Sequence, residues 1–232
     1  MSGGHFDYQE HSSTQQQLNR EHGSIPGLGL QWVVRTRNLK FTTSTLFQKG
    51  KIQYDGALQN GLPYQTNTDE MLQQILLSVS PMVNPLITPI LGLGAWHWKR
   101  EILPGSAMTS SGNQTIEGLL ERYHWLYFKA GASITLPHLL PSSRHPYLQL
   151  LSLSWTKPIE AEMEVFLPNR SVTVKPASKT GYILSYGISR EPVTLIAFHR
   201  RWNFDRSSTV NGVFEPKSQT KISGVKLKLN FF

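Results

Sequence analysis

The chain has 232 residues, a formal net charge of +8 and no cysteine. The lack of cysteine excludes disulfide bonds, thiolate metal sites and a cysteine nucleophile. Hydrophobic residues make up 39% of the chain. Its most apolar stretch, 71–96, is interrupted by polar residues and prolines, so no run of about 20 apolar residues could form a transmembrane helix. The basic residues are scattered and form no helix or stripe, so no nucleic-acid partner is predicted.

Alternating apolar and polar residues, the pattern of a strand with one oily face, recur along the chain. In chain order, this pattern predicts strands at 6–12, 25–35, 39–54, 71–80, 87–101, 122–136, 147–155, 181–188, 193–205 and 222–232. The first of these is weak, so 1–24 is read as a weak strand plus a polar loop. Residues 137–146 are predicted as a turn, and 157–179 has no clear pattern. A single domain of residues 1–232 is expected.

The segment 122–136 gives the clearest alternation. It runs for about 15 residues, whereas strands of globular proteins typically have about 5 or 6. A tilted strand that crosses a bilayer needs about 9 to 11 residues. Long connections alternate with short ones along the chain, as in barrels that cross a membrane. The predicted fold is all-β, an antiparallel up-and-down transmembrane β-barrel of about ten strands, with eight as the alternative.

The last segment also alternates. Its apolar face carries Val225, Leu227, Leu229 and Phe231, and the other face carries Lys226, Lys228 and Asn230. A strand at the end of a chain frays unless it is tied into a sheet. The segment is therefore predicted to close the barrel, with Lys226, Lys228 and Asn230 facing inward.

Aromatic residues gather at one end of several predicted strands. Trp96, Trp98, Trp125 and Trp202 are interpreted as an aromatic girdle at a membrane interface, since amphipathic rings prefer the headgroup level. The alternative is an aromatic cluster at one end of a soluble β-sandwich.

Four basic residues alternate with oily neighbours and are predicted to face the lumen: Arg35, Lys129, His199 and Arg201. Inward charges need partners, for which Glu101, Glu121 and Asp205 are candidates. Two interpretations remain open. The interior is either plugged by satisfied charges or forms a narrow lumen for small solutes.

No catalytic, cofactor or metal site is predicted. Two His-x-Ser triplets, at 11–13 and 22–24, could suggest a serine hydrolase, but both are better explained by chance. Other residues considered for a catalytic rim are Asp55, Asp69 and Asp205 with His97 or His124. Each acid is interpreted as a solvated loop residue. His97, His124 and His199 lie in three different strands without a metal-binding motif.

Four segments carry a resemblance to a known class of protein: 24–30 (Ser-Ile-Pro-Gly-Leu-Gly-Leu), 52–56 (Ile-Gln-Tyr-Asp-Gly), 88–95 (Thr-Pro-Ile-Leu-Gly-Leu-Gly-Ala) and 212–216 (Gly-Val-Phe-Glu-Pro). They resemble segments of small outer-membrane β-barrel proteins of Gram-negative bacteria. The Pro-x-x-Gly-x-Gly-Ala pattern is especially similar to that of OmpA-like and OmpW-like barrels. The resemblance covers about 25–232, although the terminal apolar frame is offset by one residue from the usual pattern.

The resemblance implies a monomer in the bacterial outer membrane. Its expected partners are outer-membrane lipid, including lipopolysaccharide, and the barrel-assembly machinery during insertion. The residues after Met1, Ser-Gly-Gly-His-Phe-Asp, include no basic cluster and no apolar run. An outer-membrane location therefore requires that a signal peptide has been removed or truncated.

Three functions are compatible with these patterns. The preferred hypothesis is a non-catalytic outer-membrane barrel with a structural, surface-binding or small-solute role. The alternatives are a hydrolase of lipid or peptide with a site at the barrel rim, and a soluble β-barrel that binds a small apolar ligand.

Overall fold

A computed structural model describes residues 1–57, 63–84, 86–109, 112–136 and 148–229. The strands are β1 (Ser2–His11), β2 (Gln17–Arg35), β3 (Leu39–Ala57), β4 (Pro63–Pro81), β5 (Ile87–Ile102), β6 (Gly105–Thr109), β7 (Gly112–Ile116), β8 (Leu119–Leu136), β9 (Leu148–Leu167), β10 (Arg170–Val174), β11 (Ala177–Arg190), β12 (Val193–Asp205) and β13 (Lys217–Leu229). In this described part of the chain, no helix is long and apolar enough to cross a membrane.

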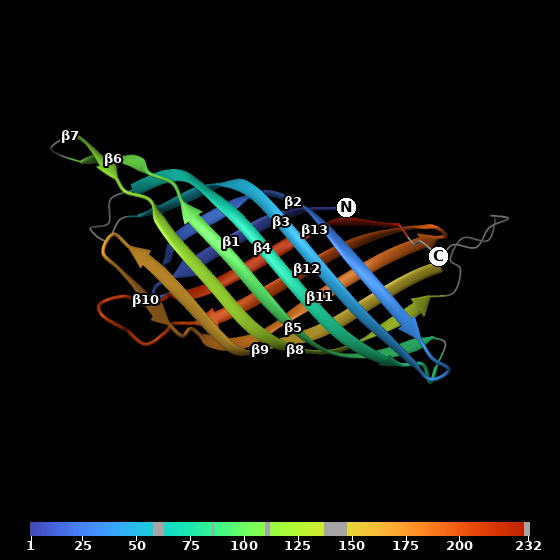
Figure 1. The fold of residues 1–232 in the computed structure, drawn as a ribbon. Helices are drawn as coiled ribbons and strands as arrows, with labels where there is room; N and C mark the ends of the chain where they lie inside the picture. The colour runs from blue at the N-terminus through green and yellow to red at the C-terminus, as the bar shows by residue number, and fades with distance from the viewer. Residues whose placement is uncertain (58–62, 85, 110–111, 137–147, 230–232) are drawn as a thin grey trace.

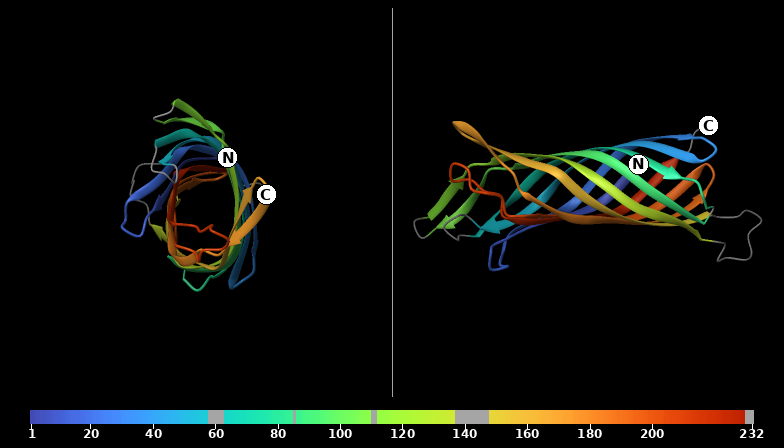
Figure 2. Two further views of the ribbon diagram at one scale, coloured as in Figure 1. Left: turned by 90° about the vertical axis from the view of Figure 1, so that its left-hand side faces the viewer. Right: turned by 90° about the horizontal axis from the view of Figure 1, so that it is seen from below.

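Ten of the strands form a closed antiparallel barrel, as predicted. Around the wall the order is β9, β11, β12, β13, β1, β2, β3, β4, β5 and β8, and β8 pairs with β9 to close the ring (Figure 1). The first and last strands lie side by side, with Phe6 opposite Ile222. β1 pairs with β2 as far as Gly27, and β2 continues beyond this point paired with β3. The barrel has an oval outline when it is seen along its axis (Figure 2).

The two ends of the barrel differ. At one end, called the hairpin end, the β6–β7 hairpin and the β9–β10 hairpin project beyond the wall (Figures 1 and 2). At the opposite end, called the turn end, short connections at 36–38, 82–86 and 191–192 join neighbouring strands. β8 also ends at the turn end, and the residues that follow it, 137–147, lie outside the described part of the chain.

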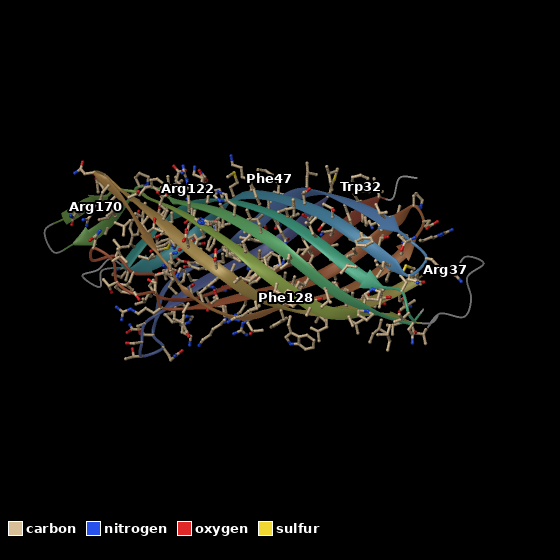
Figure 3. The ribbon with its side chains drawn as sticks, turned by 60° about the horizontal axis from the view of Figure 1, so that its bottom comes forward. Trp32, Arg37, Phe47, Arg122, Phe128 and Arg170 are labelled. Carbon is tan, nitrogen blue, oxygen red and sulfur yellow. The ribbon has the colours of Figure 1, made fainter. Side chains whose placement is uncertain are left out.

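The half of the wall near the turn end is apolar outside. Its exposed residues include Leu30, Trp32, Phe47, Leu77, Leu91, Leu93, Phe128, Ile134, Leu153, Trp155, Ile188, Leu195 and Leu227. On β8 this apolar face runs from Leu126 to Ile134, which at the usual rise and tilt is about 20 Å along the axis. Figure 3 shows Trp32, Phe47 and Phe128 on the outer surface, between Arg122 and Arg170 near the hairpin end and Arg37 at the turn end. This outer surface is the apolar band of a membrane barrel.

The polarity of the two faces reverses halfway along the strands. On β12, Val193 and Leu195 face outward near the turn end, whereas Arg201 and Asn203 face outward near the hairpin end. The inward face of β12 becomes apolar toward the hairpin end, where Trp202 and Phe204 are buried. On the hairpin side of the apolar band, the outer face of the wall contacts headgroups and water. The apolar side chains of the hairpin half are therefore packed inside the barrel.

The stretch 157–179, which showed no clear pattern in the sequence, contains the second half of β9, the whole of β10 and the start of β11. Pro158 obscures the alternation, and the β8–β9 register shifts close to it, between Leu126 and Tyr127. Beyond it, Ala161, Met163 and Val165 are buried while the glutamates between them face outward. The predicted turn at 137–146 and the inward position of Asn230 lie outside the described residues.

Candidate functional site

The interior of the hairpin half is organised around one arginine. Arg100 on β5 is 1% exposed. Its Nε donates to Glu21 Oε1 at 2.7 Å, and its Nη1 donates to Glu10 Oε1 at 3.2 Å and to Glu121. These carboxylates come from β2, β1 and β8, so a single guanidinium links four strands across the lumen. We call Arg100 and its carboxylates Glu10, Glu21 and Glu121 the arginine cluster.

A fourth carboxyl group extends the arginine cluster. Glu70 on β4 is fully buried and accepts a hydrogen bond from the Trp98 indole. A buried carboxyl group without a cationic partner is costly to ionise, so this indole contact helps to hold Glu70 inside the barrel.

The connection 206–216 folds into the mouth of the barrel at the hairpin end (Figure 2). It reverses at Asn211 and Gly212, which both have positive φ and lie between the paired residues Val210 and Val213. An Asn-Gly pair is the preferred sequence for such a tight turn. The connection carries Glu215 inward, where this carboxyl group is 2% exposed. We call 206–216 the inward loop.

Glu215 contacts two tyrosine hydroxyls. Its Oε1 lies 2.9 Å from Tyr8 Oη, and its Oε2 lies 3.2 Å from Tyr123 Oη. The same hydroxyls also contact Glu10 and Glu121. Burial, together with the charges of Glu10 and Glu121, raises the pKa of Glu215 well above its usual range. Because each hydroxyl has only one proton, a protonated Glu215 can act as the donor that the network lacks.

Docking of the inward loop is therefore expected to weaken as the pH rises. A carboxyl group whose pKa is raised in the folded state stabilises that state fully below its unfolded pKa, and this contribution is lost as the pH passes the folded pKa. Hydrogen-exchange protection at the Glu215 amide, which donates to Ser207 Oγ at 2.8 Å, should fall over this interval. Glu215→Gln, which keeps a donor at every pH, should remove the dependence. Glu117→Gln, in an exposed connection at the same end, should leave it unchanged, and an unaltered profile in Glu215→Gln would contradict this account.

An aromatic layer fills the lumen next to the arginine cluster. Its buried members are Phe6, Trp96, Trp98, Trp125, Tyr127, Trp202 and Phe204. Rings from strands that are not neighbours in the wall meet across the interior. Tyr127 and Trp202 are 5.0 Å apart between ring centroids, and Trp125 and Trp202 are 5.6 Å apart. Contacts of this kind leave few voids larger than a water molecule.

The lumen below the aromatic layer, toward the turn end, is basic. The side chains that face inward there include Arg200, Lys129, Lys226, Lys228, Lys40 and Arg35. We call these residues the basic chamber. Lys129 and Lys226 are only half-buried although they point inward, so solvent reaches this part of the interior.

Several of the predicted site residues lie elsewhere in the structure than the sequence analysis placed them. The predicted girdle residues Trp96, Trp98, Trp125 and Trp202 are at most 4% exposed and lie inside the barrel, so they form no lipid-facing girdle. The reversal of face polarity explains this difference, because in the hairpin half the aromatic face is the inner one. The exposed tryptophans are Trp32 and Trp155, which lie in the apolar band.

Two of the four predicted lumen bases lie on the outer surface. His199 contacts Ser223 Oγ, and Arg201 Nε donates to Asn203 Oδ1; all four residues are on the outer face of the wall. The inward base between them is Arg200, which the sequence pattern missed because its neighbours on that face, Phe198 and Trp202, are aromatic. Lys129 and Arg35 face inward, Arg35 at the rim of the turn end.

The acids and histidines considered for a catalytic rim also face outward. Asp55 lies 3.9 Å from His22, Asp69 lies 3.9 Å from Lys51, and Asp205 lies 2.7 Å from Lys179. His97 is opposite His124, which contacts Glu162 at 2.9 Å. The His-x-Ser residues at 11–13 and 22–24 lie at the end of β1 and on β2. Within the described residues, no group of three or more histidines and acids is placed to hold a metal ion.

Comparison with known proteins identifies the fold but no family. No protein-family model matches the sequence, and no curated protein matches it. The outer-membrane protease OmpT from Escherichia coli superposes with a TM-score of 0.55 at 9% identity, over 99% of this chain and 93% of OmpT. The translocator domain of the autotransporter NalP from Neisseria meningitidis gives a TM-score of 0.45 at 9% identity, over 97% and 85% of the two chains. The superposition on OmpT shows that the chain has the fold of a bacterial outer-membrane β-barrel, and its assignment to OmpA-like or OmpW-like barrels stays a prediction.

Proposed function

We propose that this protein is an outer-membrane β-barrel with a small-solute role, open to solute at the turn end and closed at the hairpin end. The observation that carries this proposal is the order of layers inside the barrel. Half-buried basic side chains line the turn half, whereas the aromatic layer, the arginine cluster and the inward loop fill the hairpin half. A solute that enters from the turn end stops at the aromatic layer.

The proposed role is non-catalytic. The carboxyl groups of the hairpin half are already engaged by Arg100, Tyr8, Tyr123 and Trp98, and the inward loop covers them. A general acid or base must come within hydrogen-bond reach of its substrate. A buried and fully packed cluster gives a substrate no such access, so we assign these groups to holding the strands together.

We place the protein in the outer membrane as a monomer, with the turn end toward the periplasm. The apolar band and the closed ring of strands support this assignment. Outward basic residues on the hairpin side of the band, among them Lys99 and Arg122, fit the phosphate groups of lipopolysaccharide as the proposed lipid partner. Insertion would depend on the barrel-assembly machinery.

Single cysteines test the closure of the lumen, since the chain has none of its own. Thr194→Cys lies on the inner wall of the turn half and Thr220→Cys on the inner wall of the hairpin half, and Thr14→Cys lies in the exposed connection between β1 and β2. In vesicles, a water-soluble maleimide should label Thr194→Cys from the turn side only, Thr14→Cys from the hairpin side only and Thr220→Cys from neither. Thr14→Cys also reports which way the barrel has inserted.

Each other labelling pattern counts against the proposal. Labelling of Thr194→Cys from both sides would identify an open pore. No labelling of Thr194→Cys in a barrel that shows heat-modifiable gel migration would identify a filled interior with a structural role alone.

A further inference from the structure

No acidic side chain of the described residues faces the space that the residues of the basic chamber line. All fifteen acidic residues of the chain lie in its described part, and none of them faces inward in the turn half. The five that face the lumen, Glu10, Glu21, Glu70, Glu121 and Glu215, all lie in the hairpin half. Glu191 occupies an exposed turn at the end of the barrel. The cations of the chamber therefore have no carboxylate to neutralise them inside the protein.

Arg200 is the most deeply placed of these cations. It is 9% exposed, and its guanidinium lies 4.9 Å from the centroid of the Trp96 ring, at the lower surface of the aromatic layer. Its Nε has no hydrogen-bond partner, and Arg200 forms no ion pair within 4.0 Å among the described residues. A cation–π contact offsets only part of the cost of burying a guanidinium.

Two lysines bring further positive charge to the same place. Lys129 follows Tyr127 on the inner face of β8, and the Tyr127 ring lies 5.0 Å from the ring of Trp202, which is next to Arg200 on the inner face of β12. Lys226 on the inner face of β13 is opposite Ile196, which lies on the inner face of β12 toward the turn end from Arg200. These residues come from β8, β12 and β13, so three separate strands each direct a cation into one space. Like charges held together in a region of low dielectric repel one another. The arrangement contrasts with the arginine cluster, where the single positive charge of Arg100 has three carboxylate partners.

We propose that the basic chamber binds a small oxyanion carrying two or more negative charges, such as a phosphate group, through Arg200, Lys129 and Lys226. A guanidinium presents a fork of donors that matches the oxygen atoms of such an anion, and lysines add mobile point charges. Three cations call for more than one negative charge, which favours a phosphate or a polycarboxylate over chloride. This inference rests on the proposed function in one respect, namely that the chamber is open to solute at the turn end.

Calorimetric titration of the refolded, detergent-solubilised barrel with inorganic phosphate, pyrophosphate and citrate tests this site. Saturable binding is expected for the wild type, with chloride at equal ionic strength as the reference. Arg200→Gln and Lys129→Gln should each weaken binding by about tenfold or more, because each removes a charge-assisted hydrogen bond. Arg201→Gln is the matched control: it removes the same charge one residue away on the outer wall, and should leave the affinity unchanged. The preference among the three anions distinguishes a phosphate ligand from a carboxylate ligand.

Thermal stability provides a readout that does not depend on the titration. Without a multivalent anion, Arg200→Met should melt at a higher temperature than the wild type, because it replaces an unpaired buried charge with an apolar side chain. Added phosphate should raise the melting temperature of the wild type but not that of Arg200→Met. Equal phosphate responses in Arg200→Met and Arg201→Gln, or no saturable binding by a folded wild-type barrel, would overturn the inference.

The two proposals can fail separately. If Thr194→Cys is labelled from both sides while phosphate still binds through Arg200, the closed lumen is wrong and the anion site stands. If the labelling pattern agrees with a closed lumen and none of the anions binds, the barrel is closed as proposed and the anion site is wrong.

Discussion

Replacing Arg100 with methionine is expected to destabilise the barrel by about 3–5 kcal/mol at neutral pH. The substitution leaves the carboxylates of Glu10, Glu21 and Glu121 buried without a counter-charge. This loss is a large fraction of the net stability of a typical domain. Urea unfolding in detergent micelles, followed by tryptophan fluorescence, measures it.

The control lies next to Arg100 on the same strand. Lys99 faces outward and pairs with Glu101 at 2.8 Å in a partly exposed position, so Lys99→Met should cost no more than about 1 kcal/mol. Lowering the pH should reduce the cost of Arg100→Met, because the carboxylates can then take up protons. Equal losses in the two variants would show that the arginine cluster does not hold the strands together.

Introducing an arginine into the apolar band should also have a large effect. Leu91 on β5 is 46% exposed, faces outward and lies in a row with Val79 and Ala130 on the neighbouring strands. Leu91→Arg is expected to cost about 2–4 kcal/mol in lipid vesicles, the range for a charge near the middle of a bilayer. The measurement is the free energy of unfolding in vesicles, together with heat-modifiable gel migration as a test of folding.

His97→Arg provides the comparison, because it adds the same side chain to the same face of β5 beyond the apolar band. Its cost should not exceed about 1 kcal/mol. If both variants lose the same stability, the boundary of the band is misplaced. A wild-type chain that stays folded and monomeric in plain buffer would favour the soluble barrel over the membrane barrel.

Much of the fold could be predicted because strand alternation is a local property. On β8, the alternation from Leu126 to Ile134 predicts a strand with one oily face whatever its partners are. The number of strands and the closure by the terminal strand followed from counting such segments and their connections. Pro158 and the register shift beside it hid the second half of β9, since a proline within a strand weakens the pattern.

The interior was harder to predict because alternation defines two faces but does not say what each one meets. The prediction of a girdle assumed that aromatic residues keep facing lipid along the whole strand. In the structure Leu195 faces outward but Trp202 faces inward. Apolar residues of β12 therefore lie on the outer face in the turn half and on the inner face in the hairpin half. Arg200 was missed for the same reason. The arginine cluster depends on Glu10, Glu21 and Arg100, which are distant in sequence and meet only once the barrel has closed.

The separation of charge along the lumen has an electrical consequence. The acids lie toward the hairpin end and unpaired bases toward the turn end, so the interior is an electric dipole aligned with the barrel axis. Its field attracts cations to one mouth and anions to the other, and burial in a low-dielectric wall limits screening by salt. The two mouths of the barrel therefore differ in the sign of the ions that they attract. Any passage opened through the aromatic layer would conduct ions more readily in one direction than in the other.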